Sequence, residues 1–193
     1  MIPVAPAPEP ASFDAVVRRP GRTWLTKHKT GKLKPYWTAC LDELWLRYHG
    51  VCAYLATHFE RVTGAASVEH FVAKSSARQL AYEWSNYRLA SRDVNGRKSD
   101  FDDVLDPFEL EPDTFRLVLV TGQIVVNPSL RGLRRQRAAD TIERLGLDRP
   151  LAREMRARHF EELHAGRRLP HYSPFVWAEM QRQAAPSRRR RRA

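Results

Sequence analysis

One stretch in the middle of the 193-residue chain carries the residues whose types and spacing could do chemistry. Glu69 and His70 stand side by side at the end of a β-compatible run, Asn86 follows about 16 residues later, and Asn95 lies further on. Hydrolysis of a phosphodiester needs a base that deprotonates water, and a neutral histidine does this when its other ring nitrogen is held. A divalent cation must neutralise the charge that builds on the phosphate oxygens. The pattern therefore indicates a one-metal phosphodiesterase site.

Each of these residues has a role in that hypothesis. His70 is the candidate general base, and Glu69 with the amide oxygen of Asn95 offers hard oxygen ligands that suit Mg²⁺, with Mn²⁺ as the alternative. Asn86 either orients His70 or pins the long loop against it. Simpler interpretations stay open: His70 as an ordinary core or surface histidine, Asn86 as a turn residue, and Asn95 as a helix C-cap in front of Gly96.

Short motifs surround these residues in a fixed order. They read Val68-Glu69-His70-Phe71, Lys74-Ser75, Trp84-Ser85-Asn86-Tyr87-Arg88-Leu89, Asn95-Gly96-Arg97-Lys98 and, downstream, Asp106-Pro107-Phe108. In this order and spacing the motifs resemble the HNH endonuclease superfamily, in the branch of Septu-like and retron-associated nucleases. The likeness covers about 50 residues directly. It rests on the joint occurrence of the motifs, since a Glu-His pair by itself carries no information.

The resemblance implies a fold, a function and a set of roles. The fold is α+β, with a ββα-metal motif (HNH or His-Me finger) embedded in a mainly helical single domain. Glu69 and Asn95 are metal ligands, His70 is the general base, Asn86 is the central Asn, and Lys98 faces the phosphate backbone. The implied activity is metal-dependent hydrolysis of DNA in anti-phage defence, beside an ATPase partner of the ABC or SMC-like type. The alternative is a catalytically silent nucleic-acid-binding or interaction subunit.

The chain departs from this family at its structural zinc. Many relatives carry two Cys-x-x-Cys pairs, and the corresponding positions hold Cys52, Leu55, Ser91 and Val94. We therefore expect no structural zinc, and we expect Leu55 and Val94 to pack in an apolar cluster near Cys52. A compensating site built from His49, Cys52 and His58 lacks a fourth ligand for tetrahedral coordination.

The charge balance points to a polyanionic partner. Lys and Arg number 33 against 22 Asp and Glu, which gives a formal net charge of +11. No base-reading helix or zinc-finger array is recognisable, so we expect contacts to phosphates and weak sequence preference. The candidate DNA-binding residues lie within or beside the proposed site: Lys74, Arg88, Arg92, Arg97 and Lys98.

Other features limit the class of protein. No apolar run approaches the roughly 20 residues that span a bilayer, and the first residues lack a signal peptide, so we expect a cytoplasmic protein without membrane contact. Two cysteines exclude a disulfide framework, and the helical spacing around Cys40 predicts a buried thiol.

The elements that must position the site follow from hydrophobic spacing and turn residues. We predict an extended N-terminal arm over 1–34, a nuclease domain over 35–184 and a basic tail over 185–193, whose role stays open between nucleic-acid binding and solubility. Within the domain, a helix covers Pro35 to Gly50 and a ββα core covers 51–98. That core contains strands over Val51 to Thr57 and Ala66 to Val72 and a helix over Leu89 to Lys98. A hairpin over Phe115 to Asn127 and three helices form the scaffold of 112–184.

Overall fold

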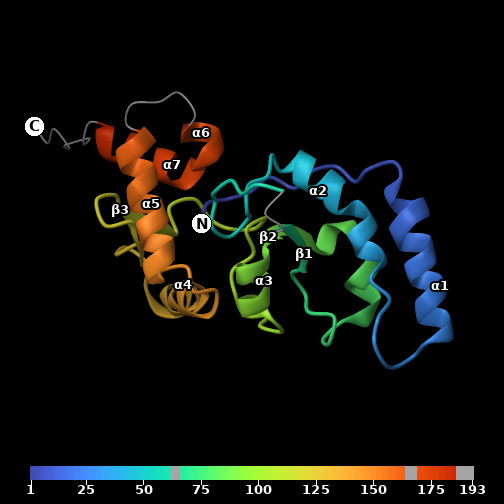
Figure 1. Cartoon of the computed structure of the whole chain (residues 1–193). Coiled ribbons are helices and arrows are strands. Elements are labelled where there is room, and N and C mark those ends of the chain that lie inside the picture. Colours follow the sequence, from blue (N-terminus) through green and yellow to red (C-terminus); the bar gives the residue numbers. More distant parts are fainter. Residues whose placement is uncertain (62–65, 164–168, 186–193) are drawn as a thin grey trace, which may run out of the picture.

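Helices and two small antiparallel sheets make an α+β fold in this computed structural model, which describes residues 1–61, 66–163 and 169–185 (Figure 1). The basic run Arg188 to Arg192 lies outside the described residues. The elements are α1 (Arg19–Lys27), α2 (Leu41–Arg47), β1 (Ala66–His70), β2 (Tyr87–Ser91), α3 (Arg92–Lys98), β3 (Phe115–Val118), β4 (Gln123–Val126), α4 (Gly132–Arg144), α5 (Pro150–Leu163), α6 (Leu169–Tyr172) and α7 (Pro174–Ala184).

A ββα unit lies in the middle of the molecule. β1 pairs antiparallel with β2, in a register that places Glu69 opposite Arg88 and His70 opposite Tyr87. α3 follows β2 directly, and the Ser91 hydroxyl caps it by accepting a hydrogen bond from the Val94 amide. α3 packs against both strands. The chain between the two strands forms the long loop over residues 71–86.

This unit begins later than the sequence predicts. Val51 to Thr57 is not a strand, since its one ladder contact is an isolated bridge between Val51 and His58. Ala56 has a φ of +50°, and its amide closes a turn on the Cys52 carbonyl. The partner of β1 is instead β2, whose last three residues, from Leu89 to Ser91, belong to the helix that the sequence predicts. Four consecutive β2 residues are buried, so the strand lacks the polar and apolar alternation that marks a half-exposed strand.

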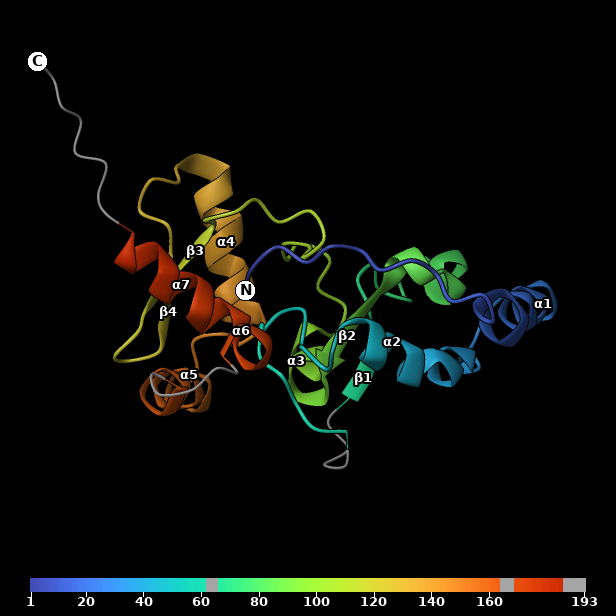
Figure 2. The same ribbon diagram turned by 90° about the horizontal axis from the view of Figure 1, so that it is seen from above.

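The two ends of the molecule cover the ββα unit from opposite sides. α1 and α2 lie at one end, and the β3–β4 hairpin with α4, α5, α6 and α7 lies at the other (Figures 1 and 2). The buried residues form two clusters accordingly. One joins α1, α2 and the strands through Phe13, Val17, Leu44, Tyr82 and Leu89. The other joins α3 to the C-terminal half through Cys52, Tyr54, Val94, Phe115 and Leu145.

The N-terminal arm is extended only in its first ten residues. Residues 14–27 are helical, as a π-helical turn followed by α1, where an extended arm was expected over 1–34. Phe13 and Val17 are fully buried at helical spacing, and Gly21 continues their stripe. A Cβ on Gly21 would lie 2.1 Å from the Tyr82 ring, so only glycine lets this helix approach the ring so closely.

Several predicted elements are confirmed. The Pro35 to Gly50 region forms a 3₁₀ turn, Tyr36–Cys40, followed by α2, and Gly50 has the expected left-handed φ of +66°. Cys40 is buried, and burial raises its pKa to about 12. β3 and β4 form the expected hairpin, which turns at Gly122. The scaffold helices appear as α4, α5 and α7, with the short α6 inserted before α7.

Candidate functional site

Glu69 and Lys98 form a buried ion pair at the centre of the ββα unit. Lys98 Nζ lies 2.9 Å from Glu69 Oε1, and neither side chain is more than 2% exposed. The second carboxylate oxygen, Oε2, accepts a hydrogen bond of 2.6 Å from the Tyr54 hydroxyl. Burial raises the pKa of Glu69, and the Lys98 ammonium and the Tyr54 hydroxyl oppose that rise. The carboxylate is thus held between a cation and a hydroxyl donor, away from water.

Lys98 also ties α3 to β1, which corrects its predicted role. Its ammonium donates to the His70 carbonyl at 3.1 Å in addition to Glu69. A fully buried, doubly bonded ammonium cannot contact a DNA phosphate. We therefore remove Lys98 from the proposed DNA-binding residues.

His70 is held in one tautomer by its neighbours. Its Nε2 lies 3.0 Å from the Ala81 carbonyl, and a carbonyl only accepts hydrogen bonds, so Nε2 carries the proton. Its Nδ1 lies 3.3 Å from Lys74 Nζ and accepts from that ammonium. The Tyr87 hydroxyl donates to the same Ala81 carbonyl at 2.8 Å. One ring nitrogen is thereby fixed as a donor, and the other keeps its lone pair.

His70 is neutral in the folded protein. Burial, with a smaller contribution from Lys74, lowers its pKa from 6.5 to about 3. As pH falls below 6.5, the unfolded chain therefore binds a proton before the folded chain does. We expect the free energy of unfolding to fall between pH 6.5 and 3 by up to about 1.4 kcal/mol per pH unit. Above pH 6.5 the ring is neutral in both the folded and the unfolded chain, so His70 causes no loss of stability there.

Urea unfolding of the wild-type chain and of His70→Gln at several pH values checks this expectation. The amide of Gln can replace the donor to Ala81 but does not titrate. The variant should show the shallower decline in stability with acid. Identical pH dependence in the two proteins would show that His70 does not carry this effect.

Asn86 pins the long loop, which is one of the two roles expected for it. Its Oδ1 accepts from the Val72 amide at 2.8 Å, and its Nδ2 donates to the carbonyls of Val72 and Leu80 at 3.0 and 3.2 Å. Asn86 makes no side-chain hydrogen bond to His70 among the described residues. It acts on His70 through the loop, because Leu80 directly precedes the residue whose carbonyl holds the ring.

Replacement of Asn86 by Ala should weaken the fold and disturb His70. The change leaves the Val72 amide without its partner, while the Leu80 carbonyl still accepts from the Glu83 amide at 3.3 Å. A buried unsatisfied polar group costs about 1–3 kcal/mol. Thermal unfolding measures this loss. As a matched control, Asn127→Ala removes a partly exposed asparagine whose amide donates to the Asp113 carbonyl in a solvent-exposed hydrogen bond, and it should cost less. Equal losses in the two variants would contradict a special role for Asn86.

Asn95 lies on the inner side of α3, against β1. Its Nδ2 donates to the Val68 carbonyl at 3.4 Å, which leaves Oδ1 as the atom available to a ligand. Asn95 is not a helix C-cap, because α3 continues to Lys98 and the left-handed residue is Ser99, with a φ of +43°. The side chain is thereby placed beside the strand that carries Glu69.

The remaining candidate DNA contacts differ in their exposure. Arg88 is buried in a bidentate ion pair with Asp106, with its guanidinium carbon 3.5 Å from the centre of the Phe108 ring, so it cannot contact phosphate. Arg97 lies 3.3 Å from the Asp93 carboxylate on the same helix. Arg92 is exposed and has no ion pair within the described residues. Lys74 is half-buried at His70. We therefore keep Arg92, Arg97 and Lys74 as candidate contacts to DNA phosphates. Arg88 is no longer a candidate.

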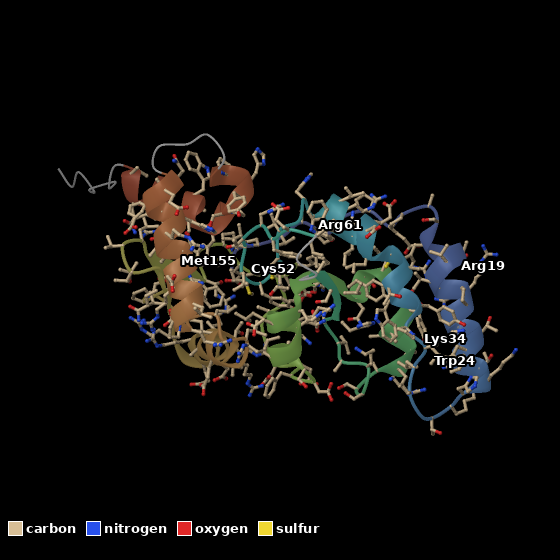
Figure 3. All side chains as sticks on the ribbon, viewed as in Figure 1. Arg19, Trp24, Lys34, Cys52, Arg61 and Met155 are labelled. Atoms are coloured by element: carbon tan, nitrogen blue, oxygen red, sulfur yellow. The ribbon has the colours of Figure 1, made fainter. Side chains whose placement is uncertain are left out.

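Of the three positions that lack a zinc ligand, Leu55 and Val94 are apolar and Ser91 is the N-cap of α3. Cys52 and Val94 belong to the buried cluster on the C-terminal side, and Leu55 packs against it. Leu55 and Val94 line one cavity of about 200 Å³. Burial raises the pKa of Cys52, which disfavours the thiolate that zinc requires. Figure 3 shows Cys52 between the ββα unit and the C-terminal helices.

We expect purified protein to contain no stoichiometric zinc. The compensating set is not assembled either, because His49 is exposed while His58 packs between Trp45 and Tyr172. Elemental analysis of unchelated protein checks the expectation. One zinc ion per chain would overturn it and would show that the apolar cluster rearranges around metal.

The donor set at Glu69 fits a hard divalent cation by its chemistry. Mg²⁺ binds hard oxygen ligands together with water, and Glu69 offers a carboxylate while Asn95 offers an amide oxygen. Within residues 1–61, 66–163 and 169–185, no group of three or more His, Cys, Asp or Glu side chains is gathered for a metal. A cation held by Glu69 and Asn95 would compete with the Lys98 ammonium for the Glu69 carboxylate.

Sequence reasoning missed two groups of the site. Tyr54 lies in a run interpreted as a strand, and nothing in its neighbours marks it as the partner of Glu69. The Ala81 carbonyl is a backbone group, which no side-chain pattern identifies. Both are positioned by the loops that flank the ββα unit.

Comparison with models of known protein families finds no family that matches this chain. A search of curated proteins finds no significant match either. None of the helices within the described residues has the length and apolar character needed to cross a membrane.

Proposed function

We propose that this chain is a metal-dependent endonuclease of the HNH type, which hydrolyses phosphodiester bonds of DNA. The observation that carries the proposal is the arrangement of His70, which ends β1 beside Glu69, with Nε2 held by the Ala81 carbonyl and with an unprotonated Nδ1 that accepts a hydrogen bond from Lys74. The Asn95 side chain and the Lys98 ammonium reach the same strand from α3. These are the parts that the HNH resemblance implies, in the order that it implies.

His70 Nδ1 acts as the base in this proposal. It takes a proton from a water molecule, whose oxygen forms a bond to phosphorus while the bond from phosphorus to the leaving sugar oxygen breaks. The proton on Nε2 stays on the ring and is donated in a hydrogen bond to the Ala81 carbonyl, which keeps the ring oriented. Glu69 and Asn95 hold a divalent cation, which when bound neutralises charge on the phosphate oxygens.

Lys74 links substrate binding to the strength of this base. In the folded protein its ammonium occupies His70 Nδ1 and helps to lower the pKa of the ring. A phosphate anion near Lys74 attracts that ammonium, which frees Nδ1 and removes part of the pKa depression. A base with a pKa nearer to neutrality is the more effective one.

The DNA contacts in this proposal go to the backbone. Arg92 is the exposed cation on α3, and neutralising one phosphate contact on duplex DNA reduces the log-log salt slope by about 0.9. We expect Arg92→Ala to flatten the slope by about one unit and Lys98→Met to leave it nearly unchanged, because Lys98 is buried. Equilibrium binding across a salt series, without divalent cation, measures both. An unchanged slope for Arg92→Ala would place the DNA on another face.

A catalytically silent nucleic-acid-binding subunit is the second candidate. The observation that favours it is that both carboxylate oxygens of Glu69 already have partners. Oε1 is paired with the Lys98 ammonium, and Oε2 accepts from the Tyr54 hydroxyl. A complex of the chain with end-labelled duplex, formed in EDTA and then given Mg²⁺, separates the two functions. The nuclease releases shorter fragments, and the silent subunit leaves the DNA intact.

A partner ATPase of the ABC or SMC-like type and a role in anti-phage defence extend the proposal, on the resemblance alone. Full-rate DNA degradation by the isolated chain would count against an obligate partner.

A further inference from the structure

A pocket of about 300 Å³ opens beside His70, outside the ββα unit. Its lining comes from the segment between α1 and α2 and from the start of the long loop. The residues that matter are Lys32, Leu33, Pro35, Trp37, Lys74 and Arg78. Figure 1 shows the first of these segments running between α1 and α2 at the end of the molecule far from α5.

Two of the lining residues place the pocket at the proposed base. The Trp37 ring lies edge-on to the His70 ring, with their centres 4.9 Å apart. Lys74 Nζ lies 3.3 Å from His70 Nδ1 and 5.3 Å from the centre of the Trp37 ring. Trp37 and Lys74 thus connect the pocket to His70, which is not itself part of the lining.

The cations around the pocket differ in what they are free to bind. Arg78 donates to the carbonyls of Gly31 and His28, so it anchors the pocket wall. Lys34 lies over the rings of Trp24 and Tyr36 and is not part of the lining. Figure 3 shows Lys34 beside Trp24.

Lys32 is exposed, and its ammonium forms no hydrogen bond, ion pair or cation–π contact with the described residues. It joins Lys74 as the pair of cations available to an anion, while Leu33, Pro35 and Trp37 supply an apolar wall.

We propose that this pocket binds one unpaired nucleotide of the DNA strand, next to the phosphate on which His70 acts. Its phosphate lies between Lys32 and Lys74, and its base lies against Pro35 and Trp37. The proposal rests on the proposed function, because it takes the substrate to be DNA. An intact duplex keeps its bases inside the stack, so only single-stranded or frayed DNA can fill the pocket.

Binding without catalysis tests the pocket. The probe is a fluorescein-labelled oligothymidylate in EDTA, whose anisotropy is followed for the full-length wild type, Lys32→Glu and Lys29→Glu. Lys29 lies exposed in the same segment but outside the lining, so it is the matched control. We expect Lys32→Glu to weaken binding about tenfold, since one contact between charges is lost and a repulsion is added. The affinity of Lys29→Glu should stay within about twofold of the wild type, because this residue acts on the bound DNA only through long-range electrostatics.

Intrinsic fluorescence supplies the second readout. Stacking of thymine should quench tryptophan emission in the wild type, and Trp37→Phe should lose that quenching while it still binds. Equal weakening by the two lysine variants would overturn the proposal. So would a duplex that binds as tightly as the single strand with the same dependence on Lys32. Failure of the nuclease function is a separate outcome: DNA would stay intact after addition of Mg²⁺ although these EDTA results hold.

Discussion

Replacement of Lys98 by Met should lower the free energy of unfolding by about 3–5 kcal/mol, because it breaks a buried ion pair by removing one partner. The ammonium is fully buried and contacts both Glu69 and the His70 carbonyl. Its removal leaves a buried carboxylate with only the Tyr54 hydroxyl as partner. The loss should shrink at acid pH, because protonation of Glu69 removes the uncompensated charge.

A double variant and a surface variant control this result. Glu69→Gln together with Lys98→Met removes both charges, and replacing a whole buried pair is often neutral, so most of the lost stability should return. Arg92→Met changes an exposed residue of the same helix, and its free energy of unfolding should stay within about 0.5 kcal/mol of the wild-type value. Denaturant unfolding of the proteins measures these differences. A small effect of Lys98→Met would mean that the pair is open to water in solution.

His70→Gln should slow DNA cleavage by about 10²- to 10⁴-fold, the usual contribution of a positioned general base. Gln retains a donor for the Ala81 carbonyl and most of the volume, so the fold should persist. Binding of DNA and its salt dependence should stay nearly unchanged, because a neutral base releases no counterions. Single-turnover cleavage of a labelled duplex measures the rate.

His28→Gln is the matched control for this variant. His28 directly follows α1, is exposed and stacks on Trp24. Its replacement should leave the cleavage rate at the wild-type level. A rate for His70→Gln equal to that of this control would show that another group takes the proton.

The chemistry-bearing residues were predictable because their types and order are local. Glu69 and His70 do end a strand, and Asn95 does lie on the following helix. The hairpin at Gly122 and the C-terminal helices were predictable for the same reason, since turn residues and helical spacing are read over short windows.

The partners of those residues were not predictable. A lysine in the last turn of a helix ordinarily faces solvent, and nothing local to Lys98 shows that Glu69, on another element, will bury it. Arg88 was predicted to contact DNA for the same reason, since its buried partner Asp106 lies beyond α3 and no local pattern connects the two residues. The helix in the N-terminal arm did have a signal, the stripe Phe13, Val17 and Gly21, which the preceding prolines obscured.

The most direct test of metal-dependent DNA cleavage is a plasmid assay. Supercoiled plasmid is incubated with the purified wild-type chain and Mg²⁺ or Mn²⁺, and in parallel with excess EDTA. The proposed site predicts nicked or linear DNA in the presence of either cation and unchanged supercoiled DNA in EDTA. Plasmid that stays supercoiled with both cations, at protein concentrations that bind all of it, would contradict a metal-dependent nuclease and favour the silent subunit. Equal cleavage with and without EDTA would contradict the assignment of Glu69 and Asn95 as cation ligands.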